Sequence, residues 1–241
     1  MVTPYPDLRH YTLRDYGNRI GIFRIMKVLD ELDIKASVAT NSAVAERYPF
    51  LVDEVNRRGW EIIAHGVDMG RLHYGGMEIE AERTQIRQAV ETLRRVSGQP
   101  VKGWLSPAKS ESANTLDLVA AEGIEYVCDW VNDDLPYPLR TAHGPVHSMP
   151  HSYEISDQTI LLQYHHTEDE FVDQVCDQFN VLYRESENGG GRIMAITLHP
   201  WMTGQPHRIK ALQTALAHIM GHDGVWSATG WEILTAFKAQ S

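Results

Sequence analysis

A regular alternation between short β-prone runs and amphipathic helical segments extends along the whole chain. Seven runs have the length and the residue types expected of strands. They span residues 34–40, 60–65, 101–107, 124–129, 146–150, 193–199 and 225–229. Strands that are separated by helices pair in parallel, because each crossover returns the chain to the same edge of the sheet. The sequence therefore predicts an α/β fold.

Helical segments lie between these runs, and their apolar residues recur at helical spacing. The segment 19–32 is a clear example, with Ile22, Ile25 and Leu29 on one face. Further helices are predicted at 42–58, 77–97, 114–123, 171–182 and 206–219, and a short one ends the chain. Gly59 ends one of them, since glycine adopts the left-handed conformation at a helix end without steric cost.

Seven strand–helix units favour a distorted (β/α) barrel, and we treat residues 1–241 as a single domain. A doubly wound open sheet is the alternative. No G-x-G-x-x-G follows a predicted strand, so dinucleotide binding has no support.

The formal net charge is −10, which argues against a nucleic-acid partner because polyanion binders carry basic faces. Cys128 and Cys176 stand in no C-x-x-C or zinc-ligand spacing, and we interpret both as reduced residues of a cytoplasmic protein. No signal peptide is recognised, and no apolar run reaches the ~20 residues of a membrane span. A membrane partner is not expected.

Polar residues follow several predicted strands at the point where each strand ends. They are His65, Ser106, Asp129, His151 and His199. The carboxyl ends of parallel strands form the face on which α/β enzymes bind their substrates. A single histidine at a strand end is more often structural, but three histidines with an aspartate indicate an active site.

We predict that His65 and His199 are catalytic, because imidazole titrates near neutral pH and can accept or donate a proton during amide cleavage. The alternative for His199 is a structural role, in which it caps the last carbonyl of its strand. Asp129 is predicted to orient a histidine or to accept a hydrogen bond from a substrate N–H group. Trp130 would form an apolar wall of the substrate site.

His151 is predicted to bind substrate as well. Glu154 and Asp157 follow it closely and are interpreted either as a substrate-binding pair or as part of a solvated loop.

Six segments occur in the chain as RDYGNRIGIFRIMKVLDEL, GWEIIAHG, GWLSPAKSES, GIEYVCDWVNDDLPY, MPHSYEISD and LHPWMTGQPHR. With these segments the chain resembles the polysaccharide deacetylase superfamily, in its allantoinase-like and cyclic imide hydrolase-like branch. The resemblance implies a distorted (β/α) barrel that hydrolyses a carbon–nitrogen bond in an amide, ureide or imide. It also implies that His199 is a general acid and that Trp104 and Pro107 belong to the substrate pocket.

Typical members of this family bind a divalent metal through one aspartate and the two histidines of an H-x-x-x-H motif. His65 occupies the first histidine position, but Met69 stands at the second, with Asp68 beside it. Thioether sulfur is a poor ligand for zinc and harder divalent ions. The resemblance therefore implies a degraded metal site, with either no cofactor or a zinc ion bound through His65.

The family's first strand carries paired carboxylates and precedes the RDYGNR-like segment, but no β-prone run precedes that segment here. We expect either a barrel that lacks this strand or a start inside the natural chain. The missing strand would expose two strand edges, which contact with another copy could cover. A homo-oligomer is therefore expected.

Three functions fit these features. The favoured one is hydrolysis of a non-peptide carbon–nitrogen bond in a small ureide or cyclic imide. A metal-dependent sugar N-deacetylase is disfavoured by Met69. A non-catalytic relative that binds such small molecules would account for the missing carboxylates.

Overall fold

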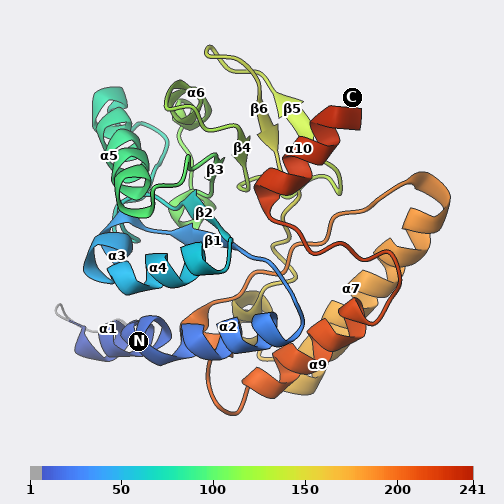
Figure 1. Ribbon diagram of the computed structural model, residues 1–241. Coiled ribbons are helices and arrows are strands. Elements are labelled where there is room, and N and C mark those ends of the chain that lie inside the picture. The colour runs from blue at the N-terminus through green and yellow to red at the C-terminus, as the bar shows by residue number, and fades with distance from the viewer. Residues whose placement is uncertain (1–6, 241) are drawn as a thin grey trace. The chain divides into compact units, whose positions relative to one another are not determined.

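The computed structural model describes residues 7–240, in which six strands form one sheet. The strands are β1 (Ser37–Thr40), β2 (Glu61–Ala64), β3 (Gly103–Trp104), β4 (Tyr126–Val127), β5 (Tyr137–Leu139) and β6 (Val146–Ser148). Their order is β1-β2-β3-β4-β6-β5, and all neighbours are parallel except β5 and β6. The predicted α/β fold with a parallel sheet is confirmed (Figure 1).

The described residues divide into two compact units, each discontinuous in sequence. The sheet unit comprises residues 35–151 and 228–240, and the helical unit comprises residues 7–34 and 152–227. The assignment of residues 1–241 to a single domain stays a prediction.

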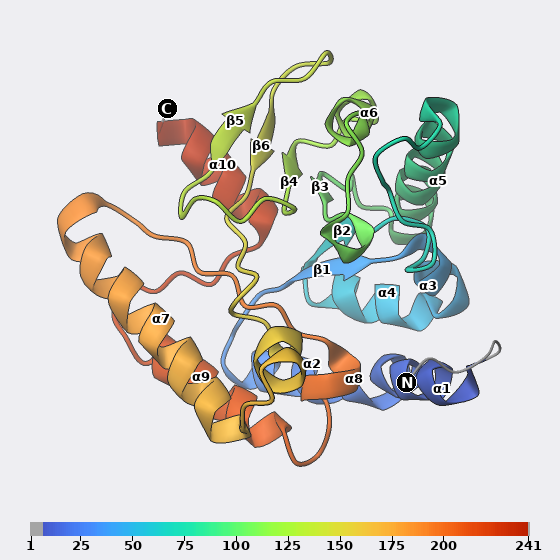
Figure 2. The same ribbon diagram turned by 180° about the vertical axis from the view of Figure 1, so that it is seen from behind.

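The helices of the sheet unit are α3 (Ser42–Arg47), α4 (Pro49–Arg57), α5 (Ile79–Ser97), α6 (Thr115–Ala121) and α10 (Gly230–Gln240). Figures 1 and 2 show α3, α4 and α5 grouped beside β1 and β2. The apolar stripe of α5 is fully buried at Ile86, Val90 and Leu93, as its helical spacing predicts. The helix ends at Gly98, whose φ of 71° requires the left-handed conformation.

The prediction of one helix over 42–58 is wrong, because Tyr48 separates α3 from α4. Pro49 is the first residue of α4 and has no N–H group with which to continue the hydrogen-bond pattern of α3.

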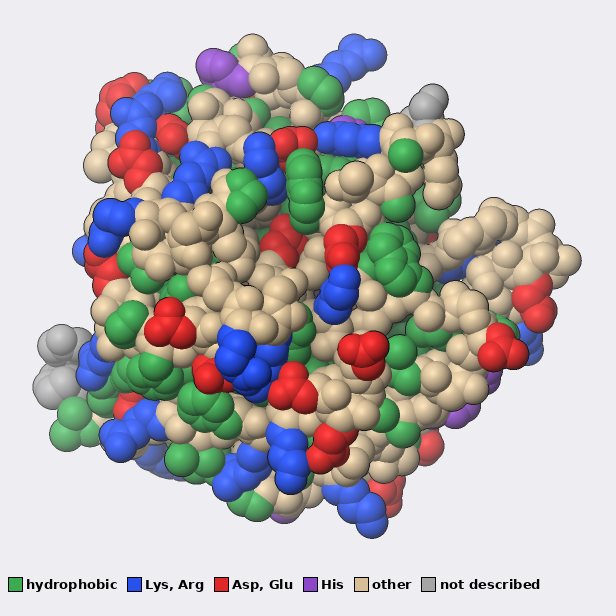
Figure 3. All heavy atoms as spheres, viewed as in Figure 1, with side chains coloured by type: hydrophobic (Ala, Val, Ile, Leu, Met, Phe, Trp, Pro, Cys, Tyr) green, Lys and Arg blue, Asp and Glu red, His purple; other side chains and the backbone are tan. Residues whose placement is uncertain are grey.

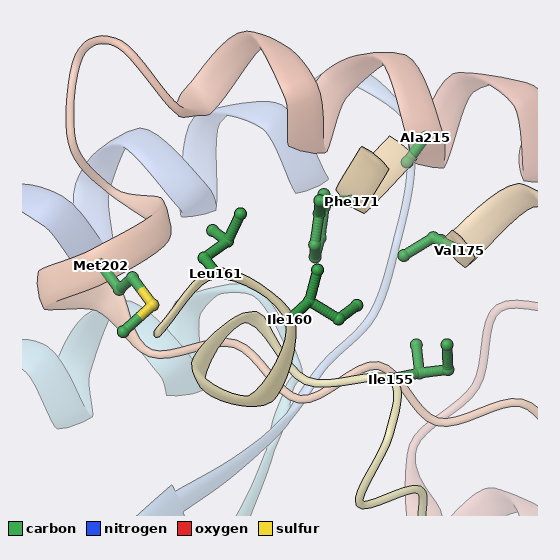
Figure 4. Packing of buried hydrophobic residues seen from close by; sticks show 7 residues of the cluster. All are labelled: Ile155, Ile160, Leu161, Phe171, Val175, Met202 and Ala215. Carbon is green, nitrogen blue, oxygen red and sulfur yellow. The ribbon is translucent and has the colours of Figure 1, made fainter. Parts of the chain in front are cut away.

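The helices of the helical unit are α1 (Leu8–Tyr16), α2 (Ile22–Glu31), α7 (Glu168–Gly189), α8 (Pro200–Thr203) and α9 (Ile209–Met220), with π-helical turns at Gly17–Gly21 and Gln158–Gln163. Its core is shown in Figure 4. Phe171 and Val175 of α7 pack with Ile160 and with Ala215 of α9 in one buried cluster. This cluster holds α7 and α9 side by side.

The turn Gly17–Gly21 packs backbone to backbone against α8. A Cβ atom on Gly17 would lie 2.6 Å from the backbone nitrogen of Trp201. A Cβ atom on Gly21 would clash with the carbonyl oxygen of Pro200. Only glycine permits so close an approach. The two glycines therefore fix the start of α8, which directly follows His199.

Two predicted strands do not form as expected. In the run 193–199, Thr197 makes a single parallel bridge with Ser156, and the run 225–229 has no strand. Strand β5 was not expected, and it lies antiparallel at the edge of the sheet. Strand formation depends on hydrogen-bonded neighbours as much as on β-prone residues, so composition alone does not determine it.

Within residues 7–240, no helix combines the length and the apolar character needed to cross a bilayer. Figure 3 shows acidic and basic side chains intermixed over the face in view.

Candidate active-site residues

The sheet unit places four of the predicted site segments at one edge of the sheet. The register pairs Ala64 with Trp104, Trp104 with Val127, and Val127 with Ser148. Because these strands are parallel, the residues that follow them lie along the same edge. His65, Ser106, Asp129 and His151 come after β2, β3, β4 and β6, so the sequence pattern located this edge correctly.

His65 is half-buried, and its Nδ1 lies 2.6 Å from the carbonyl oxygen of Leu105. A carbonyl oxygen can only accept, so Nδ1 carries the hydrogen and donates it. In the neutral ring this leaves the lone pair on Nε2, the form required of a proton acceptor. The loop after β3 therefore fixes the tautomer of His65.

Asp129 is nearly buried, with 9% of its surface exposed. Its Oδ1 accepts from the backbone N–H of Ser106 at 2.7 Å, and its Oδ2 accepts from the Ser106 hydroxyl at 2.8 Å. Ser106 in turn accepts from the indole N–H of Trp104 at 2.8 Å. This chain of bonds ties the ends of β3 and β4 together and fixes the orientation of the carboxyl group.

Burial, followed by the nearby charge of Glu111, raises the pKa of Asp129 to about 8. The two bonds from Ser106 favour the charged form but do not offset the loss of hydration. At neutral pH the Asp129 carboxyl therefore retains its proton to a large extent. It can donate a hydrogen bond, which differs from the acceptor role predicted from the sequence.

Glu111 follows β3 in the segment 107–112 and comes close to the same site. Its Oε2 accepts from the indole N–H of Trp130 at 3.0 Å. Its Oε1 is buried, and no N–H or hydroxyl group of the described residues donates to it. Sequence reasoning missed Glu111, because in the run KSES it looks like an ordinary loop residue.

Lys109 and His151 complete the group of ionisable residues near Asp129. Burial lowers the pKa of Lys109, against the opposing charge of Asp129. Burial, followed by the charge of Lys109, lowers the pKa of His151 to about 4. His151 is therefore neutral at physiological pH and suited to hydrogen bonding rather than to carrying charge.

The backbone that carries Lys109 is strained. Ala108 and Lys109 have φ angles of 55° and 54°, in the left-handed region that favours glycine. Each such residue costs on the order of 1 kcal/mol or more and persists when surrounding contacts impose it. Consecutive strain beside a group of ionisable residues is typical of functional sites.

The raised pKa of Asp129 predicts a pH dependence of stability. The ordinary pKa of an aspartate is 3.8, and that of Asp129 in the folded protein is about 8. Between these two pH values the folded state keeps a proton on Asp129 that the unfolded state has released. The free energy of unfolding should therefore fall as pH rises through this range, by at most about 1.4 kcal/mol per pH unit. Asp129→Asn should flatten this slope in urea unfolding at pH 5 and pH 8.

The matched control for that prediction is Asp53→Asn, at an exposed position of α4. If the free energy of unfolding of Asp129→Asn depended on pH as steeply as that of the wild type and of Asp53→Asn, Asp129 would release its proton at the same pH in the folded and unfolded states.

The helical unit carries a second acid–base arrangement around His199. Its Nδ1 lies 2.6 Å from Oδ1 of Asp157, and its backbone N–H donates to Oδ2 at 2.7 Å. The Thr203 hydroxyl donates to the same Oδ2 at 2.5 Å. Asp157 is fully buried, while the His199 side chain is 31% exposed. Asp157 therefore orients the ring, and the lone pair of the neutral imidazole lies on Nε2.

Glu154 and Asp157 were predicted as a possible substrate-binding pair, but their surroundings in the structure differ. Asp157 is a buried partner of His199, and a side chain without exposed surface does not fit direct substrate contact. Glu154 is exposed and accepts from the Tyr164 hydroxyl at 2.8 Å. The two do not act as a pair, because Asp157 points into the protein interior.

Trp104 and Pro107 were expected to line the substrate pocket. Trp104 is fully buried, and its ring lies edge-on to His73. Pro107 is buried against Gly66. Both residues support the loop after β3 and do not present exposed surface to a ligand. Trp130 is 37% exposed, so its role as a wall of the substrate site stays a prediction.

The metal site typical of the family does not fit the residues present. Met69 is 51% exposed at the position of the second histidine. Asp68 accepts from the backbone of Gly70 and pairs with Arg71 at 3.2 Å. Among residues 7–240, no group of three His, Cys, Asp or Glu side chains is placed to hold an ion. We therefore derive no step through a metal.

Residues 12–127 match the family model for polysaccharide deacetylase. A polysaccharide-deacetylase-like protein of Schizosaccharomyces pombe is 26% identical over 94% of this chain and 75% of its own length.

Solved structures show the same relationship. The crystal structure of PuuE allantoinase is 28% identical, with a TM-score of 0.89 over 97% of this chain and 77% of that protein. A polysaccharide-deacetylase-like structure from Pseudomonas aeruginosa PAO1 is also 28% identical, with a TM-score of 0.87 over 95% and 76% of the two chains. A family pseudoenzyme from Bacillus anthracis is 13% identical and shares the fold alone, with a TM-score of 0.59.

These matches agree with the resemblance that the six sequence segments indicate. Deacetylases of this family hydrolyse carbon–nitrogen bonds, although the Bacillus anthracis relative is described as a pseudoenzyme. The barrel-type fold inferred from the sequence is thus confirmed by the similarity to solved relatives. The resemblance to the polysaccharide deacetylase superfamily inferred from the sequence is thus confirmed, over residues 12–127 by the family model and over 97% of the chain by the similarity to PuuE allantoinase.

Proposed function

We propose that this protein hydrolyses a non-peptide carbon–nitrogen bond in a small cyclic ureide or imide. The observation that carries the proposal is the row of acid–base side chains at one edge of the sheet, with His65 held in one tautomer and Asp129 held protonated. The similarity to an allantoinase supports a cyclic ureide as the substrate class.

Hydrolysis requires a base for water, an acid for the departing nitrogen and a donor for the oxyanion. His65 and the carboxyl groups near Asp129 are candidates for the base. We propose His199 as the general acid, because Asp157 holds its ring in one orientation. Trp130 and His151 offer an aromatic surface and a neutral hydrogen-bonding group for a planar ring.

The test is a hydrolysis screen of allantoin, hydantoin, succinimide and glutarimide, with and without chelator. We expect turnover of at least one compound, and equal rates in both conditions, because Met69 and Asp68 do not form a metal site. A loss of activity in chelator that added zinc restores would contradict metal independence and favour the sugar N-deacetylase.

His199→Ala should abolish the activity found in the screen. His207→Ala is its matched control, because His207 has a side chain that is 63% exposed in the same unit. Equal activity of the two variants would remove His199 from the mechanism.

A second candidate is a non-catalytic relative that binds the same ligands. Met69 stands where typical members of the family have a metal-binding histidine. This replacement favours a non-catalytic role, since it removes a ligand of the metal that those members use. Calorimetric binding of a cyclic imide without turnover would support this function. We also propose a homo-oligomer and a cytoplasmic location, which sedimentation and fractionation would test.

A further inference from the structure

The carboxyl groups of Asp129 and Glu111 form a pair in the sheet unit. They lie within hydrogen-bonding reach of each other. Glu111 presents Oε2 to the Trp130 indole, while its Oε1 is buried without an N–H or hydroxyl donor among residues 7–240. A buried carboxylate oxygen without a donor is costly. A proton placed between the two carboxyl groups removes that cost.

The loop that carries Glu111 is anchored by a buried network. The hydroxyls of Ser112 and Thr115 each donate to Glu82 at 2.6 Å. Glu82 is fully buried and lies 3.2 Å from Nδ1 of His73. Glu111 is therefore held beside Asp129 by its neighbour Ser112, and its position is not that of a freely moving loop side chain.

We propose that Asp129 and Glu111 share a single proton and act as the acid–base pair of the hydrolysis, with Glu111 taking the proton from the attacking water. The proposal rests on the function proposed above and names the carboxylate that this function requires. Both oxygens of Asp129 accept hydrogen bonds from Ser106, whereas Glu111 accepts from one N–H group, that of the Trp130 indole, so Glu111 is the stronger candidate for the base of the pair.

The step is balanced in atoms and charge. Glu111 removes a proton from water as the water oxygen bonds to the substrate carbonyl carbon, and the carbonyl becomes an oxyanion. When the carbonyl re-forms, the carbon–nitrogen bond breaks and its electron pair goes to nitrogen. The general acid protonates that nitrogen, and the pair later releases its additional proton to solvent. The ring opens to a carboxylic acid with an amide or urea group.

Other charged groups face this pair and contribute to its titration. The ammonium of Lys109 attracts the charged form of Asp129, and Lys109 also lies near His151. The Cys128 thiol next to Asp129 is buried, which raises its pKa well above the usual value and keeps it uncharged. The active form of the pair, with one proton, should exist up to about pH 8.

The first experiment needs no substrate. Aspartate labelled with ¹³C in the carboxyl group would be titrated by NMR in the wild type, Glu111→Gln and Glu80→Gln. Glu80 is the matched control, with a side chain that is 72% exposed on α5. The Asp129 midpoint should move from about 8 toward 3.8 in Glu111→Gln and stay in Glu80→Gln. An equal midpoint in all three proteins would overturn the shared proton.

The second experiment uses a substrate found in the screen. Glu111→Gln should lower kcat by about 10²- to 10⁴-fold, and Glu111→Asp should recover part of this loss. The wild-type kcat/KM should decline above pH 8. A higher KM with unchanged kcat in Glu111→Gln would overturn the base role. If the wild type cleaves no compound, the proposed function fails, while the NMR titration still decides whether the proton is shared.

Discussion

Asp157→Asn is expected to lower kcat by about 10²- to 10⁴-fold while the protein remains folded. The carboxylate of Asp157 accepts three hydrogen bonds, from the ring and backbone of His199 and from the Thr203 hydroxyl. An asparagine has one oxygen and one NH₂ group, so one of these donors must face another donor. The ring is the group that can adapt, by moving its hydrogen from Nδ1 to Nε2.

In that tautomer Nε2 of His199 carries a hydrogen, whereas in the neutral wild-type ring it carries a lone pair. The protonated ring also loses the carboxylate that stabilises its positive charge. The change in tautomer can be measured directly by ¹⁵N NMR of the His199 ring, and the change in kcat by hydrolysis of the substrate found in the screen. These two measurements separate the orientation of the ring from the chemistry.

Asp173→Asn is the matched control, because Asp173 lies at an exposed position of α7 in the same unit. It should change neither the tautomer nor kcat. A wild-type kcat in Asp157→Asn, together with an altered tautomer, would show that the orientation of His199 has no effect on the reaction.

Glu82→Ala is expected to lower the free energy of unfolding by about 3–5 kcal/mol. Glu82 is the acceptor for the hydroxyls of Ser112 and Thr115, and it lies against His73, which is 1% exposed. Alanine removes all of these acceptor atoms and leaves a cavity lined by polar groups. Burial already lowers the pKa of His73, so protonation of this ring does not offer a compensation.

Urea unfolding measures this loss, with Glu80→Ala as the exposed control on the same helix. Glu82→Gln should lose less, because the amide keeps one acceptor oxygen. If Glu82→Ala and Glu80→Ala had the same free energy of unfolding, the buried network would contribute nothing to stability.

The order of the elements was predictable because it depends on local signals. Periodicity identified α5 through Ile86, Val90 and Leu93, and strand ends located His65 and Asp129 along one edge. The extent of the strands was less predictable. The run 193–199 is as β-prone as the others but pairs only at Thr197, since its pairing depends on a distant segment.

For the site residues as well, local signals were readable in the sequence and long-range contacts were not. His199 was predicted from its place after an apolar run, but its partner Asp157 is 42 residues away, and nothing in the sequence links them. Trp104 and Pro107 matched a pocket segment, and yet burial makes them supports for the loop after β3. Glu111 had no signal beyond following β3, because a loop carboxylate and a site carboxylate look alike in sequence.

The sequence by itself determined the α/β class, the resemblance to one family and the strand ends that carry reactive side chains, because residue spacing encodes periodicity and order. The tertiary structure decided which of these side chains are buried, which pair with one another and which can hold a proton. Hydration and hydrogen bonding set the chemistry of each group, and both depend on neighbours brought together from distant parts of the chain.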